Sequence, residues 1–249
     1  MSQKAEAFKN TSAFCHQSKN SAMKPPLFAS LILLMGFTNP FQNDLKQSLA
    51  FLKKEKATVL HIKNTSYTEG SEVLSIVAPE LMRWSAFQDF FETKADEILY
   101  VQKGAEAANF SIGHFQMKPN FVEQLEDYVA NHTELATFGY VVLKEQDPKV
   151  ARRQRIERLK RFDWQLRYAH VYWLVAKDKF KNRNFPSIKE RVAFFATAYN
   201  YGFMKPEAEI EAWQKKKAFP YGMAFKGQQD AYSDLAIAFF EDYACDFDE

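Results

Sequence analysis

A mainly helical fold is what this 249-residue sequence predicts. The chain has only 8 glycines and 9 prolines, and long stretches rich in lysine, glutamate, alanine and leucine run between them. Apolar residues in several of these stretches recur at helical spacing. Hydrophobic residues make up 47% of the chain, and 24 residues are phenylalanines, so the chain can fill a packed core. Its length allows one large domain or two small ones.

Two helical patterns precede residue 81. Residues 41–56 predict an amphipathic helix, because three leucines recur at helical spacing: Leu45, Leu49 and Leu52. Residues 72–78 are nearly all apolar, which predicts a helix inside the core. Pro79 has no backbone N–H and disfavours helical geometry in the residue before it, so this helix should end there. Glu80 is therefore expected at a helix boundary against an apolar body.

The segments around these helices differ in character. Residues 57–62 are the only strand-like stretch, and residues 64–70 and 103–110 have the composition of loops. Residues 120–131 predict a helix. Residues 87–102 predict another, with three apolar side chains turned inward: Phe91, Ile98 and Leu99.

Helices continue in the second half of the chain. Residues 152–180 form a long helical pattern that is interrupted near Asp163. Ser187 followed by Glu190 has the spacing of a capping box, so a helix should begin directly after the serine. Gly202 can end that helix. The residues beyond it add helical and loop material as a C-terminal extension.

The first 40 residues predict an export segment. The run Leu27–Phe37 is apolar and short, and lysines precede it with no acidic residue after Glu6. This pattern is typical of a secretory signal peptide, and the run is short for a membrane span. An uncleaved membrane anchor through residues 27–37 and a buried helix of the mature fold are the alternatives. We expect residues 1–40 to be a signal or anchor with a flanking disordered segment, and residues 41–249 to form the domain.

Charge and cysteine patterns argue against several classes of protein. The 33 basic residues balance 31 acidic ones, which gives no general signal for nucleic acid or membranes. The strongest basic cluster is expected to be a solvated helix face: Arg152, Arg153, Arg155, Arg158, Lys160 and Arg161. Binding of acidic wall peptides, anionic glycans or nucleic acid is the alternative, and no nucleic-acid-binding motif accompanies the cluster. Cys15 and Cys245 lack metal-site spacing, and no nucleotide-binding, metalloprotease or serine-hydrolase motif occurs, so neither metal nor organic cofactor is expected.

The segment from Ser111 to Pro119 carries most of the functional information. Its sequence, Ser-Ile-Gly-His-Phe-Gln-Met-Lys-Pro, is a poor helix or strand. Gly113 lets the backbone approach a ligand closely, and Gln116 offers both a donor and an acceptor. Sugars need such contacts, so the segment is expected to form a wall of a groove.

Three motifs in this order resemble the lysozyme-like superfamily, specifically soluble lytic transglycosylases and goose-type lysozymes. The motifs are Glu80 in Val-Ala-Pro-Glu-Leu, the Gly-His-Phe-Gln-Met-Lys-Pro segment from Gly113, and Ala-Tyr-Asn-Tyr-Gly at residues 198–202. The family has a Glu at a helix end, then Gly-Leu-Met-Gln-hydrophobic-x-Pro, then Ala-Tyr-Asn-Ala-Gly. The resemblance spans about residues 70–205. His114-Phe115 replaces the Leu-Met pair, and the interval from the acid to the second motif is longer than in most members.

The resemblance implies a lysozyme-like helical domain that cleaves peptidoglycan glycan strands between N-acetylmuramic acid and N-acetylglucosamine. Glu80 would be the single catalytic acid, and 1,6-anhydro products would form without a metal or cofactor. Burial beside apolar groups raises the pKa of a carboxyl, which such an acid needs. The protein would then work outside the cytoplasm, in the periplasm or cell envelope.

Substrate binding is implied by the same resemblance for five residues: Ser111, Gly113, Gln116, Tyr199 and Asn200. Gln116 and Ser111 would hydrogen-bond the sugar or its N-acetyl group, and Tyr199 would lie near the acid. The replacement His114 is expected to be packed or to line the groove, and Met117 to belong to the core.

The residues leave alternatives open. Glu80 could instead be solvated or paired with Arg83, and Tyr199 could be an ordinary buried aromatic residue. A hydrolytic lysozyme would need a second carboxylate, for which the candidates share one helix face: Asp89, Glu92 and Asp96. A non-catalytic peptidoglycan-binding protein on the same fold is the rival from another class. A cytoplasmic helical interaction protein follows if residues 27–37 belong to the core.

Overall fold

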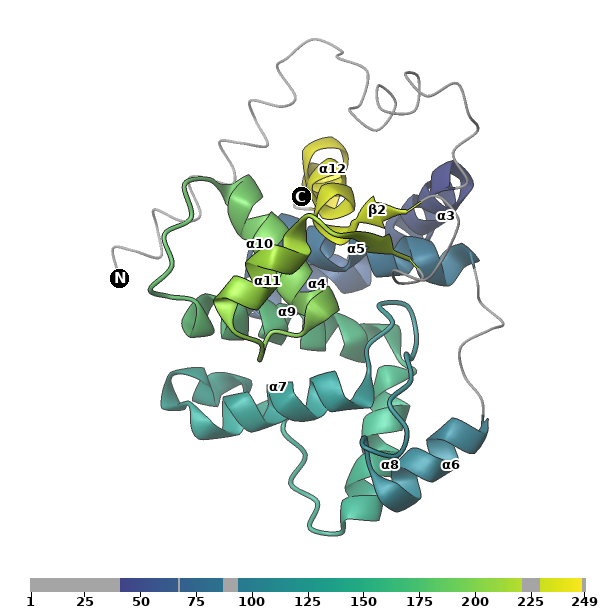
Figure 1. The fold of residues 1–249 in the computed structure, drawn as a ribbon. Coiled ribbons are helices and arrows are strands. Elements are labelled where there is room, and N and C mark those ends of the chain that lie inside the picture. The colour runs from purple at the N-terminus through teal and green to yellow at the C-terminus, as the bar shows by residue number, and fades with distance from the viewer. Residues whose placement is uncertain (1–40, 67, 87–93, 221–228, 248–249) are drawn as a thin grey trace.

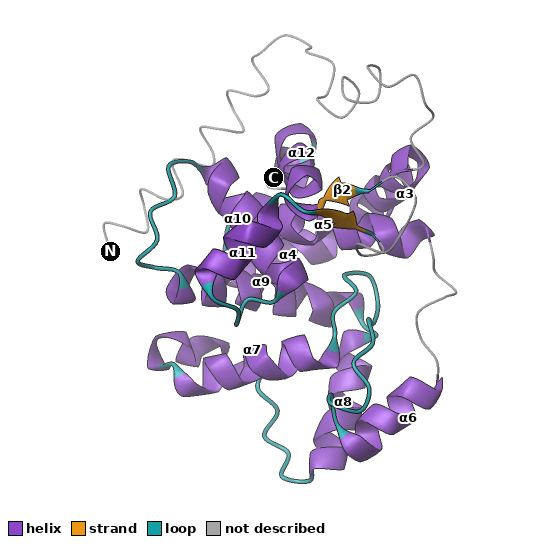
Figure 2. Cartoon of the chain, in the orientation of Figure 1, coloured by secondary structure: helices purple, strands orange, loops and turns teal. Residues whose placement is uncertain are grey.

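The computed structural model describes residues 41–66, 68–86, 94–220 and 229–247, and this part of the chain is mainly helical, as predicted (Figures 1 and 2). The expected export segment within residues 1–40 and the expected inward residue Phe91 lie outside the described residues. None of the helices in the described ranges combines the length and the apolar composition that a membrane span needs.

Helices occupy most of the described sequence, and they are α3 (Phe41–Lys54), α4 (Lys56–Ser66), α5 (Gly70–Ala86), α6 (Lys94–Lys103), α7 (Pro119–Asn131), the 3-10 helix η1 (Thr133–Val141), α8 (Pro148–Leu159), α9 (Phe162–Lys179), α10 (Ile188–Tyr201), α11 (Glu207–Gln214), α12 (Tyr232–Asp242) and the 3-10 helix η2 (Ala244–Phe247). Two short strands, β1 (Lys217–Phe219) and β2 (Asp230–Ala231), pair in antiparallel fashion.

The helices form two groups that α9 joins. Helix α5 packs against α3, α10 and α12, and these make the first group together with α4 and α11. The second group contains α6, α7, α8 and η1, which lie below the first in Figure 1. Helix α9 contacts α4 and α5 on one side and α7, α8 and η1 on the other. The loop between α6 and α7, which contains the Gly113 motif, rises between the two groups (Figure 1).

Helix α5 is the centre of the first group, and it does not end at Pro79 as predicted. It continues to Ala86 with the proline inside it. The proline removes one helical hydrogen bond, but apolar residues on both sides of it are almost completely buried: Val77, Ala78, Leu81 and Met82. Tertiary packing of the whole helix outweighs the lost bond, so Glu80 lies within the helix and not at its boundary.

Three other predictions about the first half of the chain were wrong in whole or in part. The expected loop at residues 64–70 is partly helical, because α4 extends to Ser66 and α5 begins at Gly70. Residues 57–62 are helical and belong to α4, where Val59 and Ile62 are buried three residues apart, which is a helical period. In α6 the side chains of Ile98 and Leu99, predicted to point inward, are 64% and 41% exposed. That helix packs on α8 through the opposite residues, of which Tyr100 is fully buried.

Three helix boundaries in the second half were predicted correctly, although α8 begins at Pro148 and not at residue 152. Helices α8 and α9 are separated just before Asp163. The Ser187 hydroxyl accepts a hydrogen bond from the backbone N–H of Glu190 at 3.2 Å and caps α10. Gly202, with φ +127°, ends that helix.

The basic cluster is a solvated face only in part: three of its side chains are exposed as predicted (Arg153, Lys160 and Arg161), whereas the other three pack against neighbouring elements. Arg155 is buried, and its guanidinium binds the Glu126 carboxylate on α7 with a shortest N–O distance of 2.7 Å. Arg158 donates to the Val141 carbonyl at 2.5 Å. Arg152 donates to the Val101 carbonyl at 3.3 Å. These side chains fasten α8 to the neighbouring elements, because a buried guanidinium needs several acceptors.

Candidate functional site

Glu80 is a buried carboxyl in the middle of α5. Its residue is only 5% exposed. The Asn200 side-chain N–H₂ donates to Glu80 Oε1 at 3.4 Å, from the last turn of α10. Glu80 Oε2 lies 3.4 Å from Nη1 of Arg83, one helical turn further along α5. The two motifs that the sequence places 120 residues apart therefore meet at this carboxyl.

Opposing effects act on the protonation of Glu80. Burial raises its pKa above the ordinary value, because a charged carboxylate loses hydration. The positive charge of Arg83, the hydrogen bond from Asn200 and the charge of Lys118 each lower it by smaller amounts. The net shift is upward. Such a carboxyl stays protonated to a higher pH than a solvated one and can act as a general acid.

The turn before α7 lies across from Glu80 and is rigidly held. Ile112 and Met117 form an isolated antiparallel bridge, with N···O distances of 3.0 and 3.1 Å. Gly113 adopts φ +66°, and a Cβ there would clash with the Gln165 side chain and with the Leu159 carbonyl. Glycine is required at this position both by conformation and by space.

Gln165 of α9 is the residue that holds this turn. Its side-chain N–H₂ donates to the carbonyls of Ile112 and Leu159 at 2.6 Å each, and its Oε1 accepts from the Phe115 N–H at 2.7 Å. The residue is completely buried. Sequence reasoning missed it, and the available signal was an amide residue on the apolar face of a long helix.

Gln116 is linked to Glu80 indirectly, because both side chains contact Arg83. Its Nε2 donates to the Gly113 carbonyl at 2.8 Å, which closes the turn. Its Oε1 accepts from Arg83 Nη2 at 3.2 Å. Arg83 therefore bridges Gln116 and Glu80. Gln116 also has φ +49°, an uncommon conformation for a non-glycine residue that recurs at functional sites.

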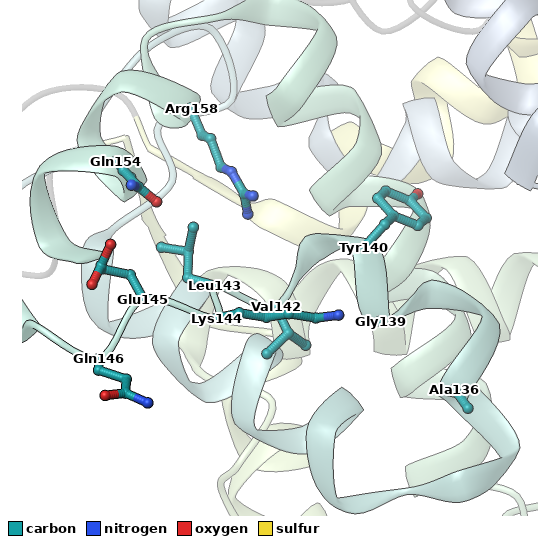
Figure 3. Close-up of a pocket in the computed structure, with 10 residues that line it drawn as sticks. All are labelled: Ala136, Gly139, Tyr140, Val142, Leu143, Lys144, Glu145, Gln146, Gln154 and Arg158. Atoms are coloured by element: carbon teal, nitrogen blue, oxygen red, sulfur yellow. The ribbon is translucent and has the colours of Figure 1, made fainter. Parts of the chain in front are cut away.

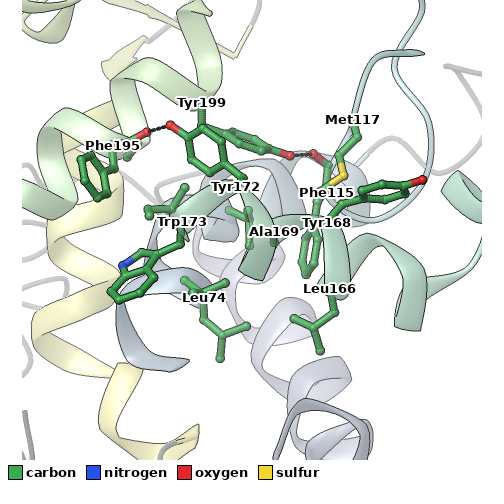
Figure 4. Packing of buried hydrophobic residues seen from close by; sticks show 14 of the residues in the cluster. Leu74, Phe115, Met117, Leu166, Tyr168, Ala169, Tyr172, Trp173, Phe195 and Tyr199 are labelled. Carbon is green, nitrogen blue, oxygen red and sulfur yellow. Dashed lines mark hydrogen bonds between the residues drawn. The ribbon is translucent and has the colours of Figure 1, made fainter. Parts of the chain in front are cut away.

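Two buried tyrosines flank the acid. The Tyr199 hydroxyl donates to the Phe115 carbonyl at 2.7 Å and so ties α10 to the turn (Figure 4). The Tyr232 hydroxyl donates to the Ile76 carbonyl at 3.0 Å, one turn before Glu80. Burial, and then the charge of Glu80, raise the pKa of both phenols well above the ordinary value. Sequence reasoning did not identify Tyr232, since it lies outside all three motifs.

The structure thus brings most of the sequence-predicted residues together. Gln116, Tyr199 and Asn200 surround or link to Glu80 through the contacts described above, and Gly113 shapes the turn. Ser111 is buried at the start of the same turn. Two further expectations agree: Met117 is buried and His114 is packed. The pairing of Glu80 with Arg83, by contrast, was the alternative to a catalytic role, and this contact is present.

Of the three proposed partner carboxylates, Asp96 is the one that falls within the described residues. Asp96 lies in the first turn of α6, in the second helix group. Asp89 and Glu92 fall in residues 87–93, outside the described ranges. The ionic groups that act on the pKa of Glu80 are the cations Arg83 and Lys118. Across the described ranges, no cluster of three His, Cys, Asp or Glu side chains could hold a metal.

Two surface pockets lie away from Glu80, and that residue lines neither of them. The larger, about 1010 Å³, is bounded by η1, the following loop and α8, with Tyr140, Lys144 and Arg158 among its lining residues (Figure 3). The smaller, about 400 Å³, lies between α6, α7 and α8 beside Arg152. Arg158 is already engaged by a backbone carbonyl and the Tyr168 hydroxyl. We place the candidate site at Glu80, because a perturbed buried acid is a better indicator of chemistry than the size of a hollow.

Comparisons of this chain with protein-family models, with curated proteins and with solved structures gave no match.

Proposed function

We propose that the chain is a peptidoglycan lytic transglycosylase with a lysozyme-like fold, and that Glu80 is its single catalytic residue. One observation carries the proposal: a carboxyl with a raised pKa is buried between the Gln116 turn and Asn200. The residues that meet there are those of the three motifs that resemble the family. The substrate would be the bond between N-acetylmuramic acid and N-acetylglucosamine.

In the first step Glu80 would donate its proton to the glycosidic oxygen. The bond from that oxygen to the anomeric carbon breaks, the leaving sugar departs as an alcohol, and positive charge develops on the ring. A raised pKa favours this step, because the acid must be protonated at the working pH.

In the second step the Glu80 carboxylate would act as a base. It takes the proton of the 6-hydroxyl group, and O6 bonds to the anomeric carbon of the same muramic acid ring. The product is a 1,6-anhydro sugar, no water is consumed, and the acid is restored. Arg83, 3.4 Å from the carboxylate, would stabilise the ionised form between the two steps.

Asn200 and Gln116 would orient the acid and the sugar. The Asn200 amide already donates to Glu80, and Gln116 offers amide groups of the kind that bind hydroxyl and N-acetyl groups. The substrate lies outside the cytoplasm, so the proposal requires export, for which residues 27–37 are the proposed signal.

Mass analysis of the products of peptidoglycan digestion tests this function. Wild-type protein should release anhydro-muropeptides, which are lighter than hydrolysis products by one water. Glu80→Gln should lower the rate by about 10²- to 10⁴-fold, because the proton donor is lost. The exposed Glu157→Gln is the matched control and should retain full activity. Products with only reducing ends would identify a hydrolytic lysozyme.

The Glu80–Arg83 contact favours a second candidate, a non-catalytic peptidoglycan-binding protein of the same fold. An ion pair stabilises the charged carboxylate, which cannot donate a proton. This candidate predicts that wild type and Glu80→Gln bind the wall equally and that neither clears it. Equal clearing by both proteins would instead refute the assignment of Glu80.

A further inference from the structure

An aromatic cluster lies next to the candidate site and has no role in the mechanism above. It consists of Phe51 from α3, Trp84 from α5, His114 from the turn, and Phe162 at the start of α9. The His114 ring stacks on Phe51 with ring centres 4.6 Å apart and an interplanar angle of 18°. Its centre lies 4.1 Å from that of Trp84 and 5.3 Å from that of Phe162.

The rings of this cluster are only half-buried, unlike the large aromatic residues of the core. The Trp84 ring contacts two residues of the cluster from other segments of the chain, Phe51 and His114, and Phe162 packs on both of these. The ring centres lie 4.1 Å apart for Trp84 and His114 and 5.8 Å apart for Trp84 and Phe51. A braced and incompletely buried tryptophan keeps its geometry and still offers apolar surface to a ligand.

A histidine at position 114 destabilises the fold more than an apolar residue would. Burial lowers its pKa to about 4, so the ring is neutral at ordinary pH. Its Nδ1 is buried and makes no hydrogen bond to the described residues. An unsatisfied polar atom costs free energy that a leucine would not. What a histidine adds over leucine is a flat ring, and a flat ring is what stacks on Phe51 and supports Trp84.

The cluster is continuous with the proposed active site. Trp84 follows Glu80 by four residues on α5, which places it on the same side of the helix about 6 Å further along the axis. His114 precedes Gln116 by two residues in the turn that faces the acid. The distance from acid to tryptophan is thus comparable to the size of one sugar ring.

We propose that Trp84, braced by Phe51 and His114, is the surface on which a sugar ring of the glycan strand stacks beside the bond that Glu80 would cleave. This inference rests on the proposed function for its substrate class. A pyranose ring has one apolar face of C–H groups, which an aromatic ring covers, while its edge hydroxyls remain free for groups such as Gln116 and Asn200.

Binding of the N-acetylglucosamine tetramer, measured by calorimetry in the Glu80→Gln background, tests the stacking surface. Adding Trp84→Leu keeps apolar bulk and removes the ring, and it should weaken binding about tenfold. Adding Trp84→Phe keeps a ring and should weaken binding only about threefold. The matched control is Trp164→Leu, because Trp164 is also half-buried and packs on Arg158 rather than near the acid; it should leave binding unchanged.

A second measurement holds even if the leucine variant is poorly folded. Sugar stacking should shift the tryptophan fluorescence of the Glu80→Gln protein, and the shift should be absent from the protein that also carries Trp84→Phe. Thermal unfolding of each variant checks that its fold is retained.

The outcomes separate this inference from the proposed function. Unchanged affinity and an unchanged fluorescence shift in the Trp84 variants would overturn the stacking surface. So would failure of the Glu80→Gln protein to bind the tetramer. In either case the enzymatic proposal stands if wall clearing still requires Glu80. Loss of tetramer binding in Trp84→Leu, together with wall clearing that ignores Glu80, would support the stacking surface and reject the enzyme.

Discussion

Glu80 is held between burial, which favours its neutral form, and Arg83, which favours its charged form. A residue with this balance can serve both as acid and as base in one reaction, provided that neither effect dominates completely. The sequence identified Glu80, Gln116 and Asn200 through the order of their motifs. It could not show that Arg83 bridges two of them, since that depends on how the turn approaches α5.

Arg83→Met should move the alkaline limb of the pH–rate profile to higher pH. Arg83 lowers the pKa of Glu80, so its removal raises that pKa further, and the acid stays protonated to higher pH. The maximal rate should fall, because Gln116 loses its partner. Rates of peptidoglycan cleavage across a pH series provide the measurement. Arg153→Met, a change of an exposed arginine on α8, should leave the limb in place, and an unmoved limb in Arg83→Met would contradict the expected coupling.

At the scale of single elements, local signals predicted some helices well and failed for others. The start of α10 was predictable because a cap depends only on neighbouring residues. The continuation of α5 past Pro79 was not, because packing against α3, α10 and α12 supplies the stabilisation. The same holds for α6, whose buried face is decided by its contact with α8 and not by which residues are most apolar.

Ser187→Ala should lower the free energy of unfolding by about 1 kcal/mol, because the hydroxyl accepts from the first turn of α10. Urea denaturation measures the change. Thr133→Ala, which alters an exposed hydroxyl in η1 that caps no α-helix, should have a smaller effect. Equal effects from both substitutions would argue against a cap.

Arg155→Met should destabilise the protein by about 3–5 kcal/mol, because the Glu126 carboxylate would be left buried without its cation. Equilibrium urea denaturation again gives the value. The double variant Arg155→Met/Glu126→Leu should be considerably more stable than the single one, since no buried charge remains. If the double variant is no more stable than Arg155→Met, the cost does not come from an unpaired Glu126 carboxylate.

At the scale of the whole molecule, a half-buried and a fully buried histidine, His114 and His170, make stability depend on pH. Burial lowers the pKa of His114 to about 4 and that of His170 to about 3, from 6.5 in an unfolded chain. Below pH 6.5 the unfolded state therefore binds protons that the native state does not. Stability should fall as the pH decreases from 6.5 to about 4, and further to about 3 for His170. Glu80 acts in the opposite direction, because its stabilising neutral form is lost as the pH rises through its raised pKa.

His114→Leu should make this decline shallower between pH 6.5 and about 4, because one of the two histidines that resist protonation is gone. Free energies of unfolding from urea titrations at several pH values test the point. Parallel profiles for variant and wild type would mean that His114 is not held neutral in the native state. The slope that remains belongs to His170 and the carboxylates.

The division into two helix groups joined by α9 was not predictable from sequence. It depends on long-range contacts such as those of Gln165, which hold the turn against α9. Composition and periodicity gave the helical class, while the placement of the Gly113 motif opposite Glu80 required the packed structure.

The proline within α5 has one more consequence. Pro79 has no N–H to donate to the Ser75 carbonyl, so α5 lacks one backbone hydrogen bond immediately before the acid. The direction in which Glu80 points is therefore set by the neighbouring helices more than by its own. A substitution of Pro79 that restores this hydrogen bond should stabilise α5 but change the orientation of the Glu80 side chain. Stabilising substitutions far from residue 79 should leave that orientation unchanged.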